Sequence, residues 1–196
     1  MYHIITIERP YASGGNEIGK KLAETLGYKL YDRNILTEAA KNLGIPQIHI
    51  SNLDETSSGS VFFNLSKTAT NENSLPMAEK LFAEEKRIIE KAADEGGCVI
   101  VGRAAGYILR DRKDCLRVFV HANREFRIQR AIEREGYNRS DAENAIKKND
   151  RRRKVFYDAV TEWEWGDPKF FEVYLDSSKL GIELCTKLLA ETVLKS

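Results

Sequence analysis

The chain has 196 residues, of which 42% are hydrophobic, and its 31 Lys and Arg nearly balance its 30 Asp and Glu. This length suits one well-buried core, and the composition is that of a folded protein rather than a disordered one. The formal net charge of +1 argues against a dedicated nucleic-acid-binding surface, so we expect no nucleic-acid partner. We predict a single domain over residues 1–196.

The sequence also lacks the marks of a membrane, secreted or zinc-binding protein. No stretch approaches the ~18 apolar residues of a membrane span, and the apolar run at the N-terminus is too short for a signal peptide. Cys98, Cys115 and Cys185 lie far apart and form no C-x-x-C pair, so we expect neither disulfides nor a zinc site. We expect a cytoplasmic protein without a membrane partner, in which the three thiols are buried as small apolar groups.

The first predicted elements are a strand, a loop, a helix and a second strand. Residues 3–7 are β-branched and apolar on both faces, which indicates a buried strand of a parallel sheet. A glycine-containing turn over residues 10–15 follows. Residues 16–26 then carry apolar side chains four positions apart, and Gly27 suits the end of that helix. Residues 28–31 predict the second strand.

The middle of the chain contains its least regular stretch. Residues 34–43 again have a helical pattern, whereas residues 47–74 are polar and rich in Ser, Thr and Asn. We interpret 47–74 as a mobile loop or a small helical insertion, because so long a loop is usually functional or disordered. Pro76 suits the first turn of a helix that runs to Gly96, and residues 98–101 predict a third buried strand.

The rest of the chain continues this alternation. Residues 116–120 predict a strand and 123–134 a helix, and Ser140 with Glu143 forms a capping-box pattern that opens a basic helix to about Val160. A fifth strand over residues 172–175 and a final helix, capped by Ser177 or Ser178, complete the chain. The alternation predicts a three-layer α/β fold, in which helices cover both faces of a five-stranded parallel sheet.

Three predicted strands end in polar residues or glycine. The first leads to Ser13, Gly14 and Gly15, the second to Asp32, and the third to Gly102-Arg103. Ligands of open parallel sheets bind at the carboxyl ends of the strands, where these residues would converge. The convergence suggests a site, although plain turns would also produce such strand ends.

The first loop is the best candidate for binding phosphate. Its glycines would allow an anion to approach the free N–H groups at the start of the following helix. The pattern G-x-x-x-x-G-K-[ST] is not complete here, because Gly15 stands at the lysine position and neither Asn16 nor Glu17 after it carries the magnesium-binding hydroxyl. Taken alone, the loop leaves phosphate binding and an ordinary turn about equally open.

Basic residues cluster on the two helices that follow the fourth strand. Arg127, Arg130 and Arg134 share a helix face, and the next helix carries Asp150 followed by Arg151 to Lys154. Most such side chains face solvent, but three consecutive arginines point to three sides of a helix, so at least one should face the sheet edge. One arginine guanidinium can donate two parallel hydrogen bonds to the oxygens of a phosphate. Its charge also offsets the negative charge that develops in phosphoryl transfer.

Two tryptophans follow the basic helix. Trp163 and Trp165 could close over a nucleobase, but we favour the interpretation that they anchor their loop against the core.

Together these motifs resemble the cytidylate kinase-like family of P-loop nucleoside monophosphate kinases, over about residues 3 to 190. The stretch in the middle matches least. The motifs that carry the resemblance are Ile4-Thr6-Ile7, Ser13-Gly14-Gly15, the run from Glu17 to Ala23, Tyr31-Asp32, Val101-Gly102-Arg103, residues 150–153, Trp165 to Pro168, and Ser177 to Glu183.

The resemblance implies transfer of the ATP γ-phosphoryl group to CMP or dCMP, with Mg²⁺. It also implies a monophosphate-binding region at approximately 37–90 and a lid at approximately 134–168. The ATP phosphates would bind to Ser13, Gly14, Gly15, Asn16 and Glu17, and Glu17 is the candidate metal ligand. Asp32, Arg103, Asp150 and Arg153 would bind the nucleoside monophosphate. Arg130, Arg134 and Arg153 would be the catalytic residues around the transferred group.

The sequence departs from the family at the residues closest to the chemistry. It lacks the loop lysine and hydroxyl, and Asn16 stands where kinase-like members usually have an arginine. The aspartate of the family's Gly-Arg-Asp turn is Ala104. Loss of the lysine removes a cation from the β- and γ-phosphates, which Arg9 or Lys20 would have to replace.

Several functions therefore remain open. The first is a kinase for CMP or a related compound, and the second is a nucleotide- or phosphate-binding protein that kept the fold without the catalysis. A third is a kinase for another small phosphate acceptor, and nucleic-acid binding is a distant fourth. We expect small-molecule nucleotides as partners, and the sequence leaves a homo-oligomer open.

Overall fold

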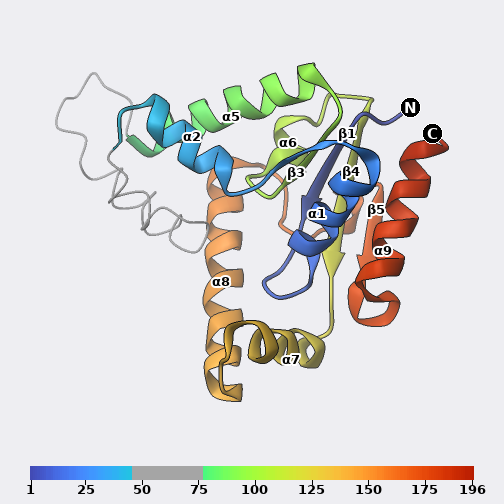
Figure 1. Ribbon diagram of the computed structural model, residues 1–196. Coiled ribbons are helices and arrows are strands. Elements are labelled where there is room, and N and C mark those ends of the chain that lie inside the picture. The colour runs from blue at the N-terminus through green and yellow to red at the C-terminus, as the bar shows by residue number, and fades with distance from the viewer. Residues whose placement is uncertain (46–76) are drawn as a thin grey trace.

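The computed structural model describes residues 1–45 and 77–196, and these residues form a five-stranded sheet with helices on both faces (Figure 1). The strand order is β2-β3-β1-β4-β5, and every neighbouring pair is parallel. The predicted fold class is confirmed. The predicted loop or insertion over residues 47–74 lies outside the described residues. The strands are β1 (Ile4–Glu8), β2 (Lys29–Tyr31), β3 (Cys98–Val101), β4 (Cys115–His121) and β5 (Val173–Asp176).

The longer helices begin and end close to their predicted positions. They are α1 (Gly15–Leu26), α2 (Asn34–Asn42), α5 (Met77–Glu95), α7 (Arg124–Glu135), α8 (Arg139–Val160) and α9 (Ser177–Leu194). Two elements had no sequence prediction, α6 (Ala105–Ile108) and the 3₁₀ helix η1 (Pro168–Phe170). Each is too short to show a helical period.

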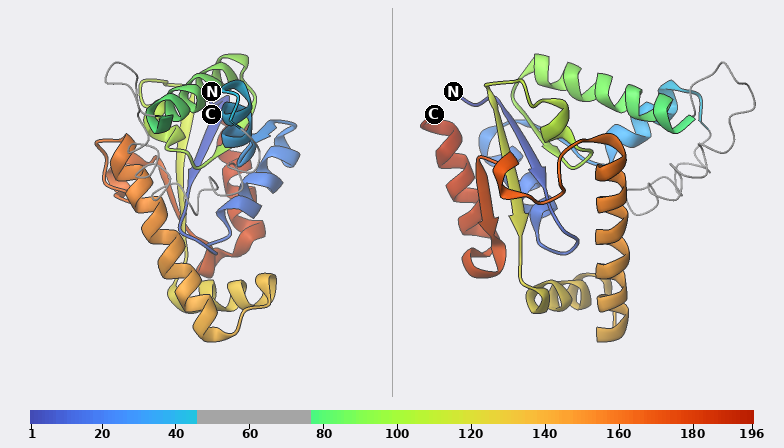
Figure 2. Two further views of the ribbon diagram at one scale, coloured as in Figure 1. Left: turned by 90° about the vertical axis from the view of Figure 1, so that its left-hand side faces the viewer. Right: turned by 180° about the vertical axis from the view of Figure 1, so that it is seen from behind.

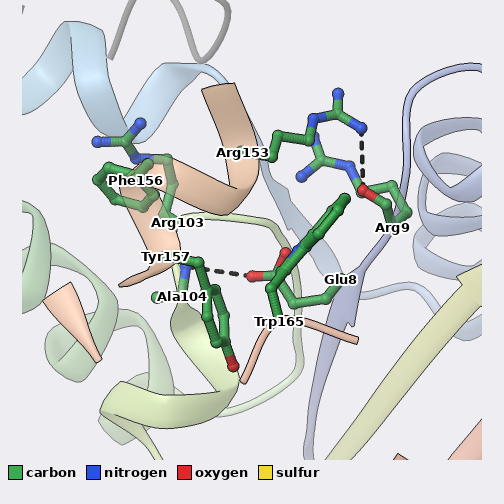
Figure 3. Close-up of a pocket in the computed structure, with 8 residues that line it drawn as sticks. All are labelled: Glu8, Arg9, Arg103, Ala104, Arg153, Phe156, Tyr157 and Trp165. Carbon is green, nitrogen blue, oxygen red and sulfur yellow. Dashed lines mark hydrogen bonds between the residues drawn. The ribbon is translucent and has the colours of Figure 1, made fainter. Parts of the chain in front are cut away.

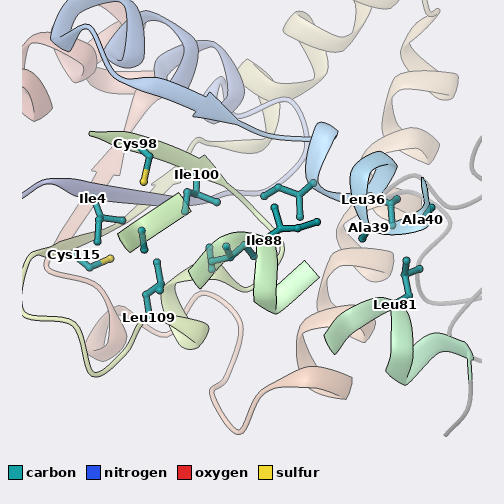
Figure 4. Packing of buried hydrophobic residues seen from close by; sticks show 14 residues of the cluster. Ile4, Leu36, Ala39, Ala40, Leu81, Ile88, Cys98, Ile100, Leu109 and Cys115 are labelled. Carbon is teal, nitrogen blue, oxygen red and sulfur yellow. The ribbon is translucent and has the colours of Figure 1, made fainter. Parts of the chain in front are cut away.

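The central strand β1 divides the core into two layers. Successive side chains of a strand point to opposite faces, so a strand covered on both faces is apolar throughout. Ile4 packs with residues of α2, α5 and α6 (Figure 4), whereas Ile5 and Ile7 pack with residues of α1 and α9. All three isoleucines are fully buried. The strand therefore places the loop that follows it at the middle of the sheet's carboxyl edge.

The α7–α8 hairpin lies beyond this edge of the sheet. Figure 2 shows α8 running alongside the loop between β1 and α1, with α7 below that loop. Gly136, at a φ of 69°, ends α7, and Asn138 caps α8 by accepting a hydrogen bond from the Asp141 N–H. The hairpin thus faces the carboxyl ends of the strands, where ligands of parallel sheets bind.

Two predicted helix caps were wrong. Ser140 lies inside α8 because Asn138, two residues earlier, makes the capping bond to the Asp141 N–H at 2.9 Å. Asp176, and neither Ser177 nor Ser178, caps α9 by accepting from the Ser178 N–H at 2.9 Å. A carboxylate or amide oxygen satisfies the first-turn N–H groups as well as a hydroxyl does.

The three cysteines are buried and form no disulfide, as predicted. Burial raises the pKa of the Cys98 thiol to about 11 and that of Cys115 to about 12. Both thiols therefore stay protonated at neutral pH and are poor nucleophiles. In the part of the chain that the structure describes, the helices are too short or too polar to span a bilayer.

Candidate functional site

The loop between β1 and α1 turns sharply through two left-handed residues. Ala12 has a φ of 60° and Gly14 a φ of 87°, a value that favours glycine. Gly14 is also the residue before α1, and no side chain caps the helix there. The N–H groups of the first turn of α1 therefore open toward the loop, in the arrangement that attracts anions to helix N-termini.

Side chains of α7 and α8 hold the loop at Tyr11. Asp150 accepts a hydrogen bond from the Tyr11 N–H at 2.8 Å, and the Arg127 Nε donates to the Tyr11 carbonyl at 2.7 Å. Arg127 and Asp150 also form an ion pair with each other. Both polar groups of one loop residue are thus bound by a charged pair from the hairpin.

The two ends of the loop have anchors of their own. Arg153 of α8 donates to the Arg9 carbonyl at 2.9 Å (Figure 3). At the other end, the buried hydroxyl of Ser177 contacts the carbonyls of Ser13 and His121, at 2.5 and 3.0 Å. Side chains of α7, α8 and α9 therefore fix the path of the loop.

A cavity of about 260 Å³ lies between the loop and the hairpin, and we call it the arginine cavity. It includes the loop from Arg9 to Ala12, the start of α1 and part of α7. Two acids, Glu17 and Glu135, also line it. Its guanidinium groups outnumber these carboxylates, so the cavity suits a multiply charged anion such as a chain of phosphates. Its five arginines are Arg9, Arg33, Arg130, Arg134 and Arg153.

Glu17 connects α1 to the hairpin across the arginine cavity. Its carboxylate accepts a hydrogen bond from Arg130 at 2.9 Å and is also paired with Arg134. The side chain of Arg130 is 15% exposed, so this pair is only partly screened by water. Two of the three predicted catalytic arginines, Arg130 and Arg134, thus lie together, and a carboxylate occupies the position between them.

A much smaller cavity of about 20 Å³ lies behind the loop, and we call it the inner cavity (Figure 3). The buried Glu8, at the end of β1, accepts a hydrogen bond there from the Ala104 N–H at 3.1 Å. The Tyr157 hydroxyl is buried without a hydrogen-bond partner among the described residues, and burial raises its pKa. The space suits about one water molecule rather than a nucleotide. Its lining consists of Glu8, Arg9, Arg103, Ala104, Arg153, Phe156, Tyr157 and Trp165.

Comparison with known proteins identifies the family. Residues 4–179 match the sequence model of the cytidylate kinase-like family. The chain belongs to that family. A comparison with curated proteins gave no match.

Solved structures support the same fold. A protein from Eubacterium ventriosum, described as uncharacterized, is 26% identical with a TM-score of 0.76, covering 98% of this chain and 99% of its own. A shikimate kinase from Bacteroides thetaiotaomicron is 13% identical with a TM-score of 0.55, covering 97% and 98%. A shikimate kinase from Acinetobacter baumannii, in complex with shikimate, is 12% identical with a TM-score of 0.53, covering 100% and 96%. The likeness to the two shikimate kinases places the chain in the P-loop kinase fold.

The family residues predicted for the ATP phosphates come together. Ser13, Gly14 and Gly15 form the turn into α1, and Asn16 and Glu17 complete its first turn. Gly14 to Glu17 line the arginine cavity, whereas the Ser13 hydroxyl is buried and donates to the Pro10 carbonyl at 3.0 Å.

The residues predicted for the nucleoside monophosphate do not share one cavity. Arg153 lines both the arginine cavity and the inner cavity, while Asp150 is engaged with Tyr11 and Arg127. Asp32 lines a third, more open cavity of about 540 Å³, which shares Asn16, Glu17 and Arg134 with the arginine cavity. Their role in binding a monophosphate stays a prediction.

Arg103 is buried in an ion pair rather than directed into the arginine cavity. Its guanidinium is paired with the buried Glu85 of α5, and it lies 4.2 Å from the centre of the Phe156 ring. Gly102, Arg103 and Ala104 all have positive φ angles, of 82°, 60° and 54°. This uncommon run of backbone turns the Arg103 side chain toward α5 and the Ala104 N–H toward Glu8.

Sequence reasoning missed Glu85 and Glu8. Glu85 lies four residues after Leu81 and three before Ile88, within the apolar face of α5. An acid within an apolar helix face needs a buried cationic partner, so the sequence itself indicated a buried ion pair at this position. Glu8 directly follows the apolar strand predicted over residues 3–7 and is the last residue of β1, which was a weaker signal.

The two tryptophans pack against the core, as the sequence favoured. Trp163 stacks on Phe170 with 4.4 Å between ring centres, and Trp165 meets Phe119 edge-on at 6.0 Å. They hold the segment that follows α8 in place.

Removal of the loop anchor should destabilise the protein and can be measured directly. Asp150→Ala leaves the Tyr11 N–H and the largely buried Arg127 without their carboxylate partner, so we expect a loss of about 2 kcal/mol in the free energy of unfolding. Denaturant titration measures this loss. Asp158→Ala is the matched control, because Asp158 lies on the same helix in an exposed pair with Lys154. Equal losses in the two variants would contradict the anchoring role.

Proposed function

We propose that this protein is a kinase that transfers the γ-phosphoryl group of ATP to CMP, dCMP or a related small phosphate acceptor. The observation that carries the proposal is the arginine cavity, where five arginines from four segments surround the uncapped start of α1. Family membership supports a kinase-like function of the same kind. We expect small-molecule nucleotides as its ligands.

The donor phosphates are assigned to the loop and the first turn of α1. Backbone N–H groups from Gly14 to Glu17 and the positive end of the α1 dipole would bind phosphate oxygens there. Arg130 and Arg134, opposite this turn, would bind the transferred group from the lid side. Phosphoryl transfer depends mostly on such positioning and charge stabilisation.

The acceptor is assigned to the side of the loop nearest α8. Arg153 reaches this side, where it donates to the Arg9 carbonyl and lines the arginine cavity, so it would contact the acceptor next to the donor phosphates. An acceptor that is already an ionised phosphate needs no strong general base, which agrees with a cavity rich in arginine. The family's description favours a cytidine monophosphate among such acceptors.

Glu17 is the residue that would hold Mg²⁺. Carboxylate oxygen is a ligand type that Mg²⁺ prefers, and the ion usually takes only one or two carboxylates beside substrate phosphates. Accordingly, no three acidic, His or Cys side chains gather into a metal-binding group within residues 1–45 and 77–196. When bound, the ion would offset the charge of the phosphates. Arg130 and Arg134 would then exchange Glu17 for phosphate oxygens.

A non-catalytic binding protein is the second candidate. Gly15 replaces the lysine of the usual P-loop and no hydroxyl follows it at Asn16 or Glu17, and this observation favours it. The same cavity would then bind phosphates without transferring them.

ADP release from ATP and Mg²⁺, measured with a panel of nucleoside monophosphates that includes CMP and dCMP, tests the kinase. We expect turnover with at least one acceptor, and Arg130→Ala should lower kcat/KM about 100-fold, because it removes a cation from the transferred group. Arg124→Ala, on the same helix but exposed and paired with Glu143, should leave the turnover nearly unchanged. Thermal stabilisation by ATP with no turnover on any acceptor would favour the binding protein instead.

Glu17 should weaken phosphate binding when no metal is present. Glu17→Gln removes a negative charge that competes for Arg130 and Arg134, so we expect metal-free ATP to bind about 5-fold more tightly. Added Mg²⁺ should reduce or reverse this gain, because the variant has lost the metal ligand. Isothermal titration with and without Mg²⁺ measures both effects, with the exposed Glu24→Gln as the control. Weaker metal-free binding by Glu17→Gln would contradict the proposed competition.

A further inference from the structure

Two positions of the loop depart together from the usual P-loop pattern, G-x-x-x-x-G-K-[ST]. Arg9 stands at its first glycine and Gly15 at its lysine. The structure shows why the two changes belong together. A Cβ atom on Gly15 would lie 2.8 Å from the Cβ of Arg9 and 2.9 Å from its Cγ. These distances are too short for real side chains, so positions 9 and 15 cannot both carry a long side chain in this backbone.

The backbone itself does not require glycine at position 15. Gly14 has a positive φ, whereas Gly15 does not. Apart from Arg9, the nearest atom to a Cβ at position 15 is the Cβ of Val120 at 3.5 Å, which is an ordinary contact. The Arg9 side chain is therefore the obstacle to a lysine at position 15.

The Arg9 side chain is oriented toward the place where phosphates are assigned. Its residue is 3% exposed, and its Nε donates to the Asn16 Oδ1 at 2.8 Å, which ties the guanidinium to the first turn of α1. Arg9 also lines both the arginine cavity and the inner cavity. A guanidinium in this position can offer paired N–H groups to phosphate oxygens.

Lys20, the other cation that could replace the lysine, lies elsewhere. Its side chain is 69% exposed, and its ammonium is 4.0 Å from the Glu24 carboxylate. It lines the third, more open cavity and not the arginine cavity.

We propose that Arg9 supplies the phosphate-binding cation of this loop, so that the charge has moved from position 15 to position 9. The ligand is the terminal phosphates of a nucleoside triphosphate, and the inference rests on the proposed function in this respect. The exchange is reciprocal: Arg9 excludes a side chain at position 15, and the absence of a side chain there gives Arg9 its room.

Four proteins test the exchange: the wild type, Arg9→Gly, Gly15→Lys, and the double variant that restores the usual pattern at both positions. Isothermal titration with ATP and with tripolyphosphate measures binding, and thermal unfolding without ligand measures packing. Arg9→Gly should weaken binding about 10-fold or more through the lost charge-assisted hydrogen bonds. Gly15→Lys should lower Tm through the clash. The double variant should recover most of the ATP affinity lost in Arg9→Gly and most of the Tm lost in Gly15→Lys.

A second set of variants keeps the proposal testable if Arg9→Gly or Gly15→Lys folds poorly. Arg9→Gln is similar in length and neutral, so it should lose binding about as Arg9→Gly does. Arg9→Lys keeps the positive charge and should retain most of the ATP binding. Lys20→Gln should bind ATP as the wild type does.

The outcomes separate this inference from the proposed function. ATP binding by Arg9→Gln and Arg9→Gly equal to that of the wild type would overturn the inference and leave the proposed function standing. A double variant no better than Arg9→Gly in binding and no better than Gly15→Lys in Tm would also overturn it. A wild type that binds neither ATP nor tripolyphosphate would overturn both.

Discussion

The charged pair between Arg127 and Asp150 is the interaction on which the site depends. One residue comes from α7 and the other from α8, and together they bind the N–H and the carbonyl of Tyr11. The pair therefore fixes the hairpin relative to the loop at the same time as it fixes the loop. With Tyr11 held, the following residues make their left-handed turn into α1, and the open N–H groups of that helix face the arginines of α7.

A site with five arginines must offset their mutual repulsion before any ligand binds. Glu17 does so for Arg130 and Arg134, and Asp150 neutralises Arg127, a sixth arginine next to the cavity. These carboxylates also make the site selective, because a ligand must carry enough negative charge to compete with them. When a phosphate chain and Mg²⁺ bind, Glu17 would contact the metal and release its arginines to the phosphates. Asp150 would keep its contacts with Arg127 and Tyr11.

The sequence predicted what depends on local pattern. Apolar runs located the five strands, and helical spacing put Arg127, Arg130 and Arg134 on one face of α7, where Arg130 and Arg134 both contact Glu17. It could not predict contacts that depend on neighbours in space. Arg103 was assigned to a ligand by resemblance, yet only the fold brings Glu85 beside it, and only the path of the loop shows that Arg9 and Gly15 compete for one volume.

A crystal structure of the protein with a non-hydrolysable ATP analogue and Mg²⁺ tests the central claim most directly. The account predicts phosphate oxygens at the N–H groups of residues 14–17, within hydrogen-bond distance of the Arg9 guanidinium. It also predicts that Arg130 and Arg134 contact phosphate in place of Glu17. A nucleotide bound away from this loop, or phosphates in the loop beyond hydrogen-bond distance of the Arg9 guanidinium, would contradict it.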